Sequence, residues 1–413
     1  MDLAASVQTW LWARYPLQTL ALCQRWMGEG FKVSVLGGRQ MLIVSDPASV
    51  ERLFKRAPQA GNDELAPFLG ASSLFLLKGD AHAAERRLLH GAVARLGGSI
   101  DFGGQLKLEL AAAGPALGRR DPLQLFRLAA LKGMAQMCFG AAADVAGLLA
   151  ASTVLFRRMS AWAMFSHGGK IKDRALSRSL AQVRAEILAL VADPDVKGRP
   201  DSYVATAAAG GAADDAIVDE VCTLLSAGSE PLASSLLWAL HFAERSPSIA
   251  ARLDDELASA EGAFARGHAP PFLDAVCKET LRFMPVVPVV DRVVTEPFEL
   301  ADVRLQVGDR VAACSYLTHR REDVFAEAGH FAPDRFLAQD FSPFAYYPFG
   351  GGVRRCIGAN LVARLLPEGI AAFRSRYVLE PQRAPSIDMK GIVLSPRGHS
   401  IRPKCLVEGA STR

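Results

Sequence analysis

The sequence predicts a mainly α-helical protein with small β-sheets. Helical spacing of apolar residues dominates from Asp80 to about Phe336, and the longest predicted helix runs from Ala216 to about Arg245. Short extended segments are expected near both ends of the chain and between residues 286 and 313. Half of the 413 residues are hydrophobic, which is enough for a large buried core. No linker-like stretch divides the chain, so we expect one domain spanning 1–413.

The N-terminal elements are marked by turn residues. A first helix is predicted from Tyr15 to Met27, before two glycines. Residues 31–36 and 40–44 flank Gly37-Gly38 and predict a hairpin. Asp46 and Pro47 then open a short helix that ends near residue 55, because aspartate caps a helix and proline fits its first position.

The later elements include the longest helix and a last hairpin. We expect the helix to be capped by Asp214 or Asp215 and to stop at Ser246-Pro247. Its apolar residues lie on all sides, so it should be buried in protein. Residues 392–401, with Pro396-Arg397-Gly398 at the bend, predict the hairpin.

Composition excludes several classes of protein. The 47 basic and 43 acidic residues are mixed along the chain, which does not indicate nucleic-acid binding. The seven cysteines are scattered and never spaced as CxxC, so neither a disulfide framework nor a zinc site is expected. No charge-free apolar run approaches the ~18 residues that a spanning helix needs, and no signal peptide opens the chain. We expect a soluble, cytoplasmic protein.

The stretch Phe349-Gly-Gly-Gly-Val-Arg-Arg-Cys-Ile-Gly358 is the most informative segment. Cys356 lies in a loop without bulky neighbours, where Gly352 and Gly358 would permit positive φ or close approach of a flat ligand. Phe349 supplies an apolar shield and Arg354 a cation. The alternative is a glycine-rich turn that holds a buried cysteine.

This order, Phe-x-x-Gly-x-Arg-x-Cys-x-Gly, resembles the haem-ligand loop of the cytochrome P450 family. The resemblance implies the cytochrome P450 fold, haem b as cofactor and the Cys356 thiolate as the axial ligand of its iron. It also implies that Phe349, Arg354 and Gly358 contact the cofactor. Because motifs in the family's order extend from about Tyr15 to Ile401, the resemblance covers most of the chain.

A second resemblance lies in Glu279-x-x-Arg282 and the segment 331–336. Glutamate and arginine at i, i+3 share one helix face. In the family, an arginine of the later segment joins this pair in a buried triad, and here it would be Arg335. These residues would be structural. Glutamate–arginine pairs at this spacing are commonplace, so the pair considered alone is a weak signal.

Three further cations match the family's propionate ligands. His82 and Arg86 stand at i, i+4 in the segment 79–87, and Arg292 lies in Val290-Asp-Arg-Val293. Haem propionates are anions, so cations that converge on them from separate segments make physical sense.

The long helix departs from the family at Ala227-Gly-Ser-Glu-Pro231. In the family an acid followed by threonine serves proton delivery and oxygen activation, but here Glu230 is followed by Pro231. Proline has neither a hydroxyl nor an N–H, and it kinks a regular helix. The kink at Pro231 can reproduce a widened helical turn that relatives have at this position, or it can mark a change in the chemistry. A water, Ser229 or a substrate hydroxyl could replace the missing donor. Ser229, Glu230 and Pro231 are thus the candidate catalytic residues.

The resemblance implies a haem-thiolate monooxygenase that inserts one oxygen atom from O2 into an apolar small molecule, such as a lipid-like, terpenoid or polyketide compound. Electrons would come from a ferredoxin and its reductase or a similar donor, docking near Cys356, and a monomer is expected. By resemblance the substrate pocket would be lined by residues 62–76, 159–167, 224–232, 284–290 and 392–394, which are mostly apolar.

Two alternatives stay open. The first is a peroxide-driven peroxygenase or an O2-independent isomerase of the same fold. Fatty-acid peroxygenases of the family carry Arg-Pro at the acid–threonine pair, whereas Glu230 would repel a fatty-acid carboxylate. The second is a haem-binding or sensor protein without catalysis, for which a proton-relaying acid has no use.

Overall fold

The computed structural model describes residues 11, 15–34, 40–57, 59, 63–158, 173–259, 269–390 and 393–404. It is mainly helical with small sheets, as the sequence predicts. The helices are α2 (Pro16–Met27), α3 (Pro47–Arg56), α4 (Ala66–Leu69), α5 (Gly79–Leu96), α6 (Phe102–Ala113), α7 (Pro122–Phe139), α8 (Ala146–Arg158), α10 (Arg174–Ala192), α11 (Pro194–Lys197), α12 (Tyr203–Ala209), α13 (Asp214–Glu244), α14 (Pro247–Ser259), α15 (Pro271–Phe283), α16 (Ser315–Thr318), α17 (Arg335–Ala338) and α18 (Ala359–Arg374).

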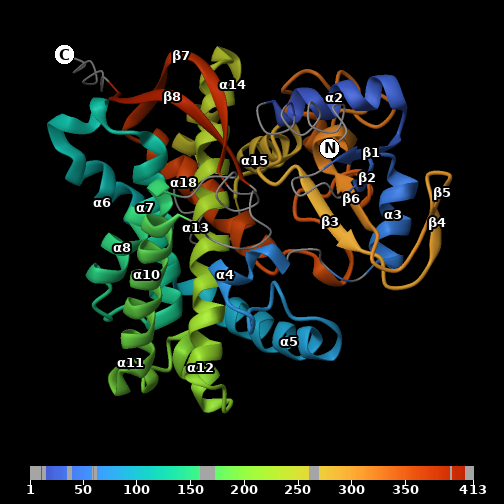
Figure 1. The fold of residues 1–413 in the computed structure, drawn as a ribbon. Helices are drawn as coiled ribbons and strands as arrows, with labels where there is room; N and C mark the ends of the chain where they lie inside the picture. Colours follow the sequence, from blue (N-terminus) through green and yellow to red (C-terminus); the bar gives the residue numbers. More distant parts are fainter. Residues whose placement is uncertain are drawn as a thin grey trace, which may run out of the picture.

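The strands form one four-stranded sheet and two hairpins. The larger sheet has the order β1-β2-β6-β3, in which only the β2–β6 pair is parallel. The strands are β1 (Gly30–Ser34), β2 (Gln40–Val44), β3 (Val289–Val293), β4 (Phe298–Leu300), β5 (Val303–Leu305), β6 (Arg310–Cys314), β7 (Tyr377–Lys390) and β8 (Val393–Pro403). Figure 1 shows the four-stranded sheet with α2 and α3 on one side of the molecule and most helices on the other.

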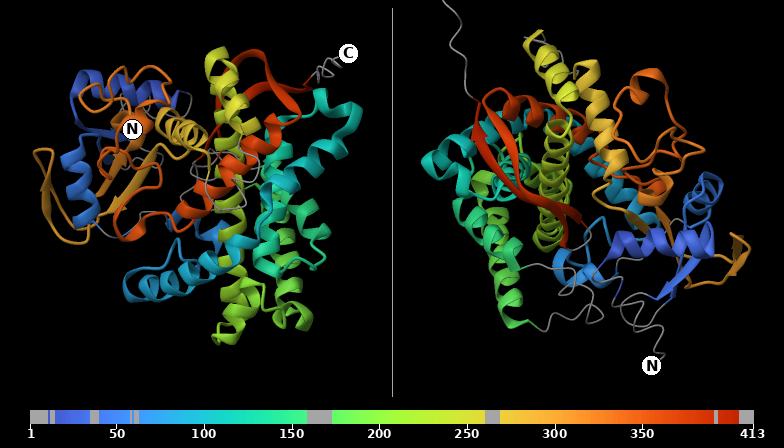
Figure 2. Two further views of the ribbon diagram at one scale, coloured as in Figure 1. Left: turned by 180° about the vertical axis from the view of Figure 1, so that it is seen from behind. Right: turned by 90° about the horizontal axis from the view of Figure 1, so that it is seen from above.

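The long helix α13 organises the helical part. It runs through the centre of the molecule with α7 and α10 beside it, and the β7–β8 hairpin lies against its C-terminal half (Figures 1 and 2). Most of its side chains are buried, which confirms the prediction of a helix enclosed by protein. One apolar cluster joins α2 to one face of the larger sheet, and another packs α3 against the opposite face.

Several local predictions are confirmed. Helix α2 and the β1–β2 pairing occur where the glycines predicted them. Asp46 caps α3, since its carboxylate accepts the Ser49 N–H at 2.8 Å, and Pro47 is the first residue of that helix.

Two local predictions are wrong. Asp214 and Asp215 lie inside the first turn of α13, and the N-cap is Ala213, whose side chain makes no capping bond. Acidic side chains in a first turn still stabilise the positive end of the helix dipole, so their sequence signal resembles that of a cap. In addition, Pro396-Arg397-Gly398 is not a bend but part of β8, opposite Ser386 and Ile387. The hairpin instead turns between β7 and β8, because β7 supplies the partner strand.

Candidate haem site

The loop that carries Cys356 is shaped by its glycines. Gly350 and Gly352 have φ of +66° and +67°, which side chains disfavour. A Cβ on Gly351 would overlap the ring of Phe54 in α3, so this glycine allows the loop to pack on that helix. The Cys356 N–H then donates to the Phe349 carbonyl at 2.9 Å and closes the loop.

Gly358 differs from the sequence-based expectation. Its φ is −84°, so positive φ does not explain this glycine. A Cβ there would meet only the Cys356 sulfur, at 3.8 Å, among the described residues. The space beyond Gly358 is therefore open on the side of the thiol, and close approach of a ligand remains the predicted reason for glycine.

The Cys356 side chain is exposed to solvent, although protein atoms crowd one side of its thiol. This crowding raises the pKa of the thiol because a thiolate loses hydration there. The Gly358 N–H, which bonds to the sulfur, and the positive charges of Arg86 and Arg355 act in the opposite direction. These groups would favour a thiolate once a positive metal ion approached the sulfur.

One histidine and three arginines from three segments meet at this loop: His82 and Arg86 of α5, Arg292 of β3, and Arg354 of the loop itself. The pKa of His82 falls to about 4, first because the ring is buried and then because Arg354, Arg86 and Arg292 surround it. Burial likewise lowers the pKa of Arg292 to about 10, with Arg354 contributing. Sequence analysis predicted all four residues as cofactor ligands, and the structure brings them together.

The arginines of this cluster bond to backbone carbonyls. Arg86 donates to the Arg355 carbonyl at 2.7 Å, and Arg292 donates to the Gly351 carbonyl at 3.3 Å. Arg354 reaches the carbonyls of Leu74, Phe75 and Leu77. Among the described residues, no carboxylate forms an ion pair with His82, Arg86 or Arg292. Like charges repel, so the cluster fits a dianionic group such as the two propionates of haem.

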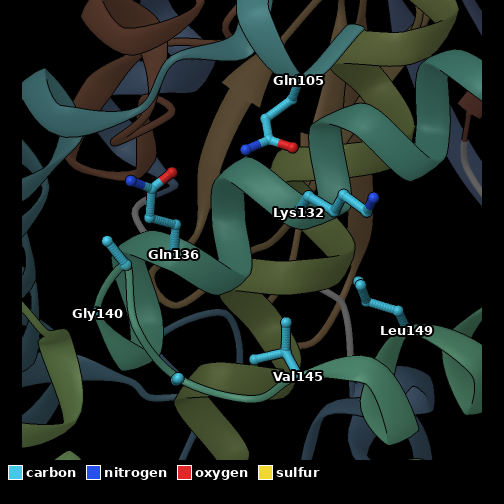
Figure 3. A pocket seen from close by; sticks show the side chains of 8 residues that line it. Gln105, Lys132, Gln136, Gly140, Val145 and Leu149 are labelled. Carbon is cyan, nitrogen blue, oxygen red and sulfur yellow. The ribbon is translucent and has the colours of Figure 1, made fainter. Parts of the chain in front are cut away.

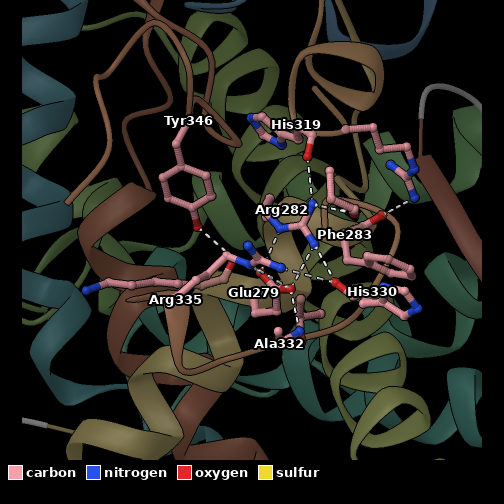
Figure 4. Close-up of polar contacts among 12 residues, drawn as sticks. Glu279, Arg282, Phe283, His319, His330, Ala332, Arg335 and Tyr346 are labelled. Carbon is pink, nitrogen blue, oxygen red and sulfur yellow. Dashed lines mark hydrogen bonds and ion pairs between the residues drawn. The ribbon is translucent and has the colours of Figure 1, made fainter. Parts of the chain in front are cut away.

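The predicted structural triad is confirmed. Arg282 and Glu279 form a fully buried bidentate pair at 2.7 and 2.8 Å, and Arg335 lies 3.2 Å from the same carboxylate (Figure 4). Arg282 also donates to the carbonyls of His319, Ala328 and His330. The triad thereby ties α15 to the segment that precedes the cysteine loop.

Helix α13 is uncovered at one place in its middle. Ala227 is exposed, and Ser226, Gly228 and Pro231 are partly exposed, whereas Val221 to Leu225 and Leu232 to Ala243 are buried. Ala227 and Pro231 are separated by about one turn and so share a face. The helix continues through Pro231, and because proline has no N–H, residue 231 provides no hydrogen bond to the Ala227 carbonyl.

The other two candidate catalytic residues point elsewhere. The buried Ser229 hydroxyl donates to the Leu225 carbonyl at 2.5 Å, so it is not presented to the face of Ala227. Glu230 is buried against α7 and accepts two hydrogen bonds from Arg127, one of them at 2.6 Å. Ser395 of β8 lies 3.4 Å from the same carboxylate. Sequence analysis missed Arg127, whose only signal was a charge within an apolar helix.

The predicted substrate-lining segments are described in part. Residues 159–167 lie outside the described residues, as do 62 and 392. The segments 284–290 and 393–394 do meet, because the Leu394 N–H donates to the Val286 carbonyl at 2.8 Å. A separate, open pocket of about 200 Å³ lies between α6, α7 and the start of α8 (Figure 3). It is lined by Gln105, Lys132, Gln136 and neighbours, and contains none of the predicted site residues.

Further features bear on the predicted class of protein. None of the described helices is long and apolar enough to cross a membrane. The six cysteines in the described part of the chain form no disulfide. No group of three or more metal-binding side chains occurs among the described residues.

Comparison with known proteins identifies the family. The family model for cytochrome P450 matches residues 201–402. The chain is 33% identical over 395 residues to cytochrome P450 135B1 of Mycobacterium tuberculosis, covering 87% of this chain and 80% of that protein. It is 27% identical over 409 residues to cytochrome P450 138 of Mycobacterium bovis, covering 91% and 87%.

Solved structures share the fold. Retinoic acid-bound cyanobacterial CYP120A1 superposes with a TM-score of 0.79 at 19% identity, over 93% of this chain and 94% of that one. A zebra fish cytochrome P450 with abiraterone superposes with a TM-score of 0.75 at 20% identity, over 94% and 100%. The cysteine loop, the buried triad and these similarities agree, and the chain belongs to the cytochrome P450 family of haem-thiolate oxidoreductases.

Proposed function

We propose that this protein is a monooxygenase that inserts one oxygen atom from O2 into an apolar small molecule, with haem b bound through the Cys356 thiolate. The observation that carries the proposal is the convergence of His82 with Arg86, Arg292 and Arg354 at the Cys356 loop. When bound, the haem supplies the oxygen chemistry of the family.

The protein's own residues have distinct roles in this proposal. His82, Arg86 and Arg292 bind the propionates by charge-assisted hydrogen bonds, and Arg354 contributes charge while it holds the loop 74–77. Phe349 and Gly358 would contact the cofactor near the thiolate. The uncovered face of α13 at Ala227 and Pro231 would contact the substrate.

The lining segments and the exposed side of the cysteine loop also support a class of substrate and a class of electron donor. The described pocket-lining segments are mostly apolar, which favours a lipid-like, terpenoid or polyketide substrate. The solved relatives were crystallised with retinoic acid and with abiraterone, also largely apolar molecules. We infer that electrons come from a ferredoxin and its reductase or a similar donor, near the exposed Arg355. We also propose that the protein is a monomer of the cytoplasm.

The test of the haem ligand is spectroscopic. The reduced protein with carbon monoxide should show the red-shifted Soret band that defines the family, and Cys356→His should lose it. Cys23→Ser, which changes a partly buried cysteine of α2, is the matched control and should keep the band. Survival of the shifted band in Cys356→His would refute the assignment.

A peroxide-driven reaction is the second candidate, and one observation favours it. Proton delivery from Glu230 to the face of Ala227 is hindered, because its carboxylate is bound to Arg127 and turned toward α7. This ion pair also gives Glu230 a structural use, so its presence is no longer an argument for reductive oxygen activation. Arg127 also compensates the negative charge of Glu230, which weakens the repulsion that Glu230 would exert on a fatty-acid carboxylate.

The ratio of product formed to NAD(P)H consumed separates these two candidates. A monooxygenase should form product with a reductase pair and couple most of the electrons to it. A peroxygenase should form product from hydrogen peroxide and waste electrons from any reductase. Product obtained from peroxide alone would overturn our first choice.

A further inference from the structure

The loop 70–77 is attached to the N-terminal half of α13 by three side chains that lie within two turns. Asp219 accepts the Ser72 N–H at 3.0 Å, and Glu220 accepts the Leu74 N–H at 2.6 Å. The hydroxyls of Thr223 and Ser73 are 2.6 Å apart. The residues from Asp219 to Thr223 are buried, so these bonds are shielded from water.

A glycine makes this attachment possible. Gly70 has φ of +86°, and a Cβ there would overlap the Asp219 carboxylate. Any other residue would be strained and would displace the loop from α13. Asp219 itself is held from the other side by Arg184 of α10.

The far end of the same loop meets the cationic cluster. Arg354 donates to the carbonyls of Leu74, Phe75 and Leu77, and it stands two residues before Cys356. The loop therefore links α13 to the segment that carries the thiolate. Leu76 and Leu77 keep partly exposed apolar side chains.

Glu220 lies on the face of α13 that is uncovered further along. Residues 220, 224, 227 and 231 follow the i, i+4, i+7, i+11 spacing of one helix face. Glu220 is about 10 Å before Ala227 along the axis, at a rise of 1.5 Å per residue. A shift of Leu74 would thus move the wall next to this face.

We propose that Glu220 is a positioning residue, which holds the loop 70–77 through the Leu74 N–H and thereby sets the shape of the substrate side of the haem site. This inference rests on the proposed function for the meaning of the site. The attachment of Leu74 to Glu220 involves only residues of the chain, so it can be tested independently of the proposed function.

The charge state of Glu220 gives the attachment a pH dependence. Burial raises the pKa of Glu220 to about 8, and Glu85 of α5 and Asp219 add to the effect while the Leu74 N–H opposes it. The Tyr203 hydroxyl of α12 bonds to Glu85, and Cys138 of α7 lies close to Tyr203. Glu85 and Tyr203 also have raised pKa values, and the cationic Arg184 of α10 forms its ion pair with Asp219. At neutral pH the Glu220 carboxyl of the closed loop is an uncharged acceptor, whereas the same carboxyl in contact with water ionises above its ordinary pKa of 4.5. Opening of the loop therefore becomes more favourable as the pH rises from about 4.5 to 8, and it levels off above pH 8.

The first measurement is amide hydrogen exchange of the segment 70–78 in the haem-loaded protein. Glu220→Leu removes the acceptor at similar size and should speed exchange there about tenfold, whereas Glu220→Gln keeps an acceptor and should match the native rate. Between about pH 5 and 8 exchange of the native segment should rise more steeply with pH than its intrinsic chemistry requires, and exchange in Glu220→Gln should not. Asp215→Asn, at an exposed acid of the same helix, is the matched control.

The second measurement is spectral binding of imidazole and 4-phenylimidazole to the haem iron. The native protein should change its preference between these two probes as the pH rises from about 5 to 8, and Glu220→Leu should show the changed preference already at about pH 5. Glu220→Gln should keep the low-pH preference throughout. If Glu220→Leu does not fold, the pH series of the native protein against Glu220→Gln still decides.

Two results would overturn the inference: native-like exchange in Glu220→Leu, or the same change with pH in Glu220→Gln as in the native protein. Absence of the shifted carbon monoxide band in all variants would instead defeat the proposed function, and hydrogen exchange would still report on the loop.

Discussion

At the scale of single residues, the partner of Glu230 changes how this acid is understood. Glutamate beside proline on a helix of this family indicates a proton relay when the chain is read alone. In the fold the carboxylate is buried and bound to Arg127 of α7, one helix away. A buried ion pair of this kind fixes the packing of two helices, because neither charge can be left without the other.

We expect Arg127→Leu to destabilise the protein by about 3–5 kcal/mol, since it leaves the Glu230 carboxylate buried without its cation. The double change Arg127→Leu with Glu230→Leu should recover most of the loss. The measurement is the urea midpoint of unfolding. Glu380→Gln breaks the exposed pair with Arg402 and should cost at most about 1 kcal/mol. A double variant as unstable as the single one would contradict this account.

The cationic cluster gives a second prediction at this scale. Arg86→Ala should lower the haem content of the purified protein, because a charge-assisted bond contributes about 1.5–3 kcal/mol. The spectrum of the remaining haem should be unchanged, since the thiolate is untouched. Arg87→Ala, at the exposed neighbour on α5, is the control. Full haem content in the double change Arg86→Ala with Arg292→Ala would remove these residues from the site.

At the scale of elements, α13 is the decisive helix. Its face at Ala227 and Pro231 is uncovered, its Glu230 face binds α7, and its N-terminal half holds the loop 70–77. The helix assignment continues from residue 214 to 244, so proline is accommodated within it. The energetic cost of proline is the bond that it cannot donate, about 3 kcal/mol in a regular helix.

Pro231→Thr tests what proline does there. Threonine restores an N–H toward the Ala227 carbonyl and adds a hydroxyl on the uncovered face. If a water or the substrate already supplies the donor, the ratio of product to NAD(P)H should improve little or fall. If reductive oxygen activation has been abandoned, the variant should gain reductase-driven activity. Pro231→Ala, which restores the N–H without a hydroxyl, separates the effect of the backbone from that of the side chain.

Local sequence signals predicted elements with mixed success. Asp46 and Pro47 opened α3 as expected because capping needs only neighbouring backbone. The bend at Pro396-Arg397-Gly398 was wrong because a long partner strand, β7, pairs on both sides of these residues. Proline and glycine mark turns only where no neighbouring strand compensates for them.

At the scale of the whole molecule, buried histidines make stability depend on pH. Burial lowers the pKa of His241 to about 4 and that of His319 to about 3, and it also lowers the pKa of His399. His399 Nε2 of β8 lies 3.0 Å from His241 Nδ1 of α13. The unfolded chain therefore takes up protons below about pH 6.5 that the folded protein resists.

The contribution of these histidines to stability should accordingly be full above about pH 6.5 and fall as the pH drops toward 4. The measurement is the urea midpoint at a series of pH values. The double change His241→Asn with His399→Asn should flatten the dependence, and His90→Asn, at an exposed residue of α5, should leave it unchanged. An equally steep fall in the double variant would show that other groups cause it.

The sequence by itself determined the chemistry that neighbouring residues carry. The glycines around Cys356, the i, i+3 pair of Glu279 and Arg282, and the amphipathic or apolar spacing of the helices act over a few residues, so they can be recognised without a fold. Only the tertiary structure decided which distant charges meet. It joined Arg127 to Glu230, gathered His82 with three arginines, and placed the loop 70–77 on Glu220, because helix packing brings these residues together across more than a hundred positions of the chain.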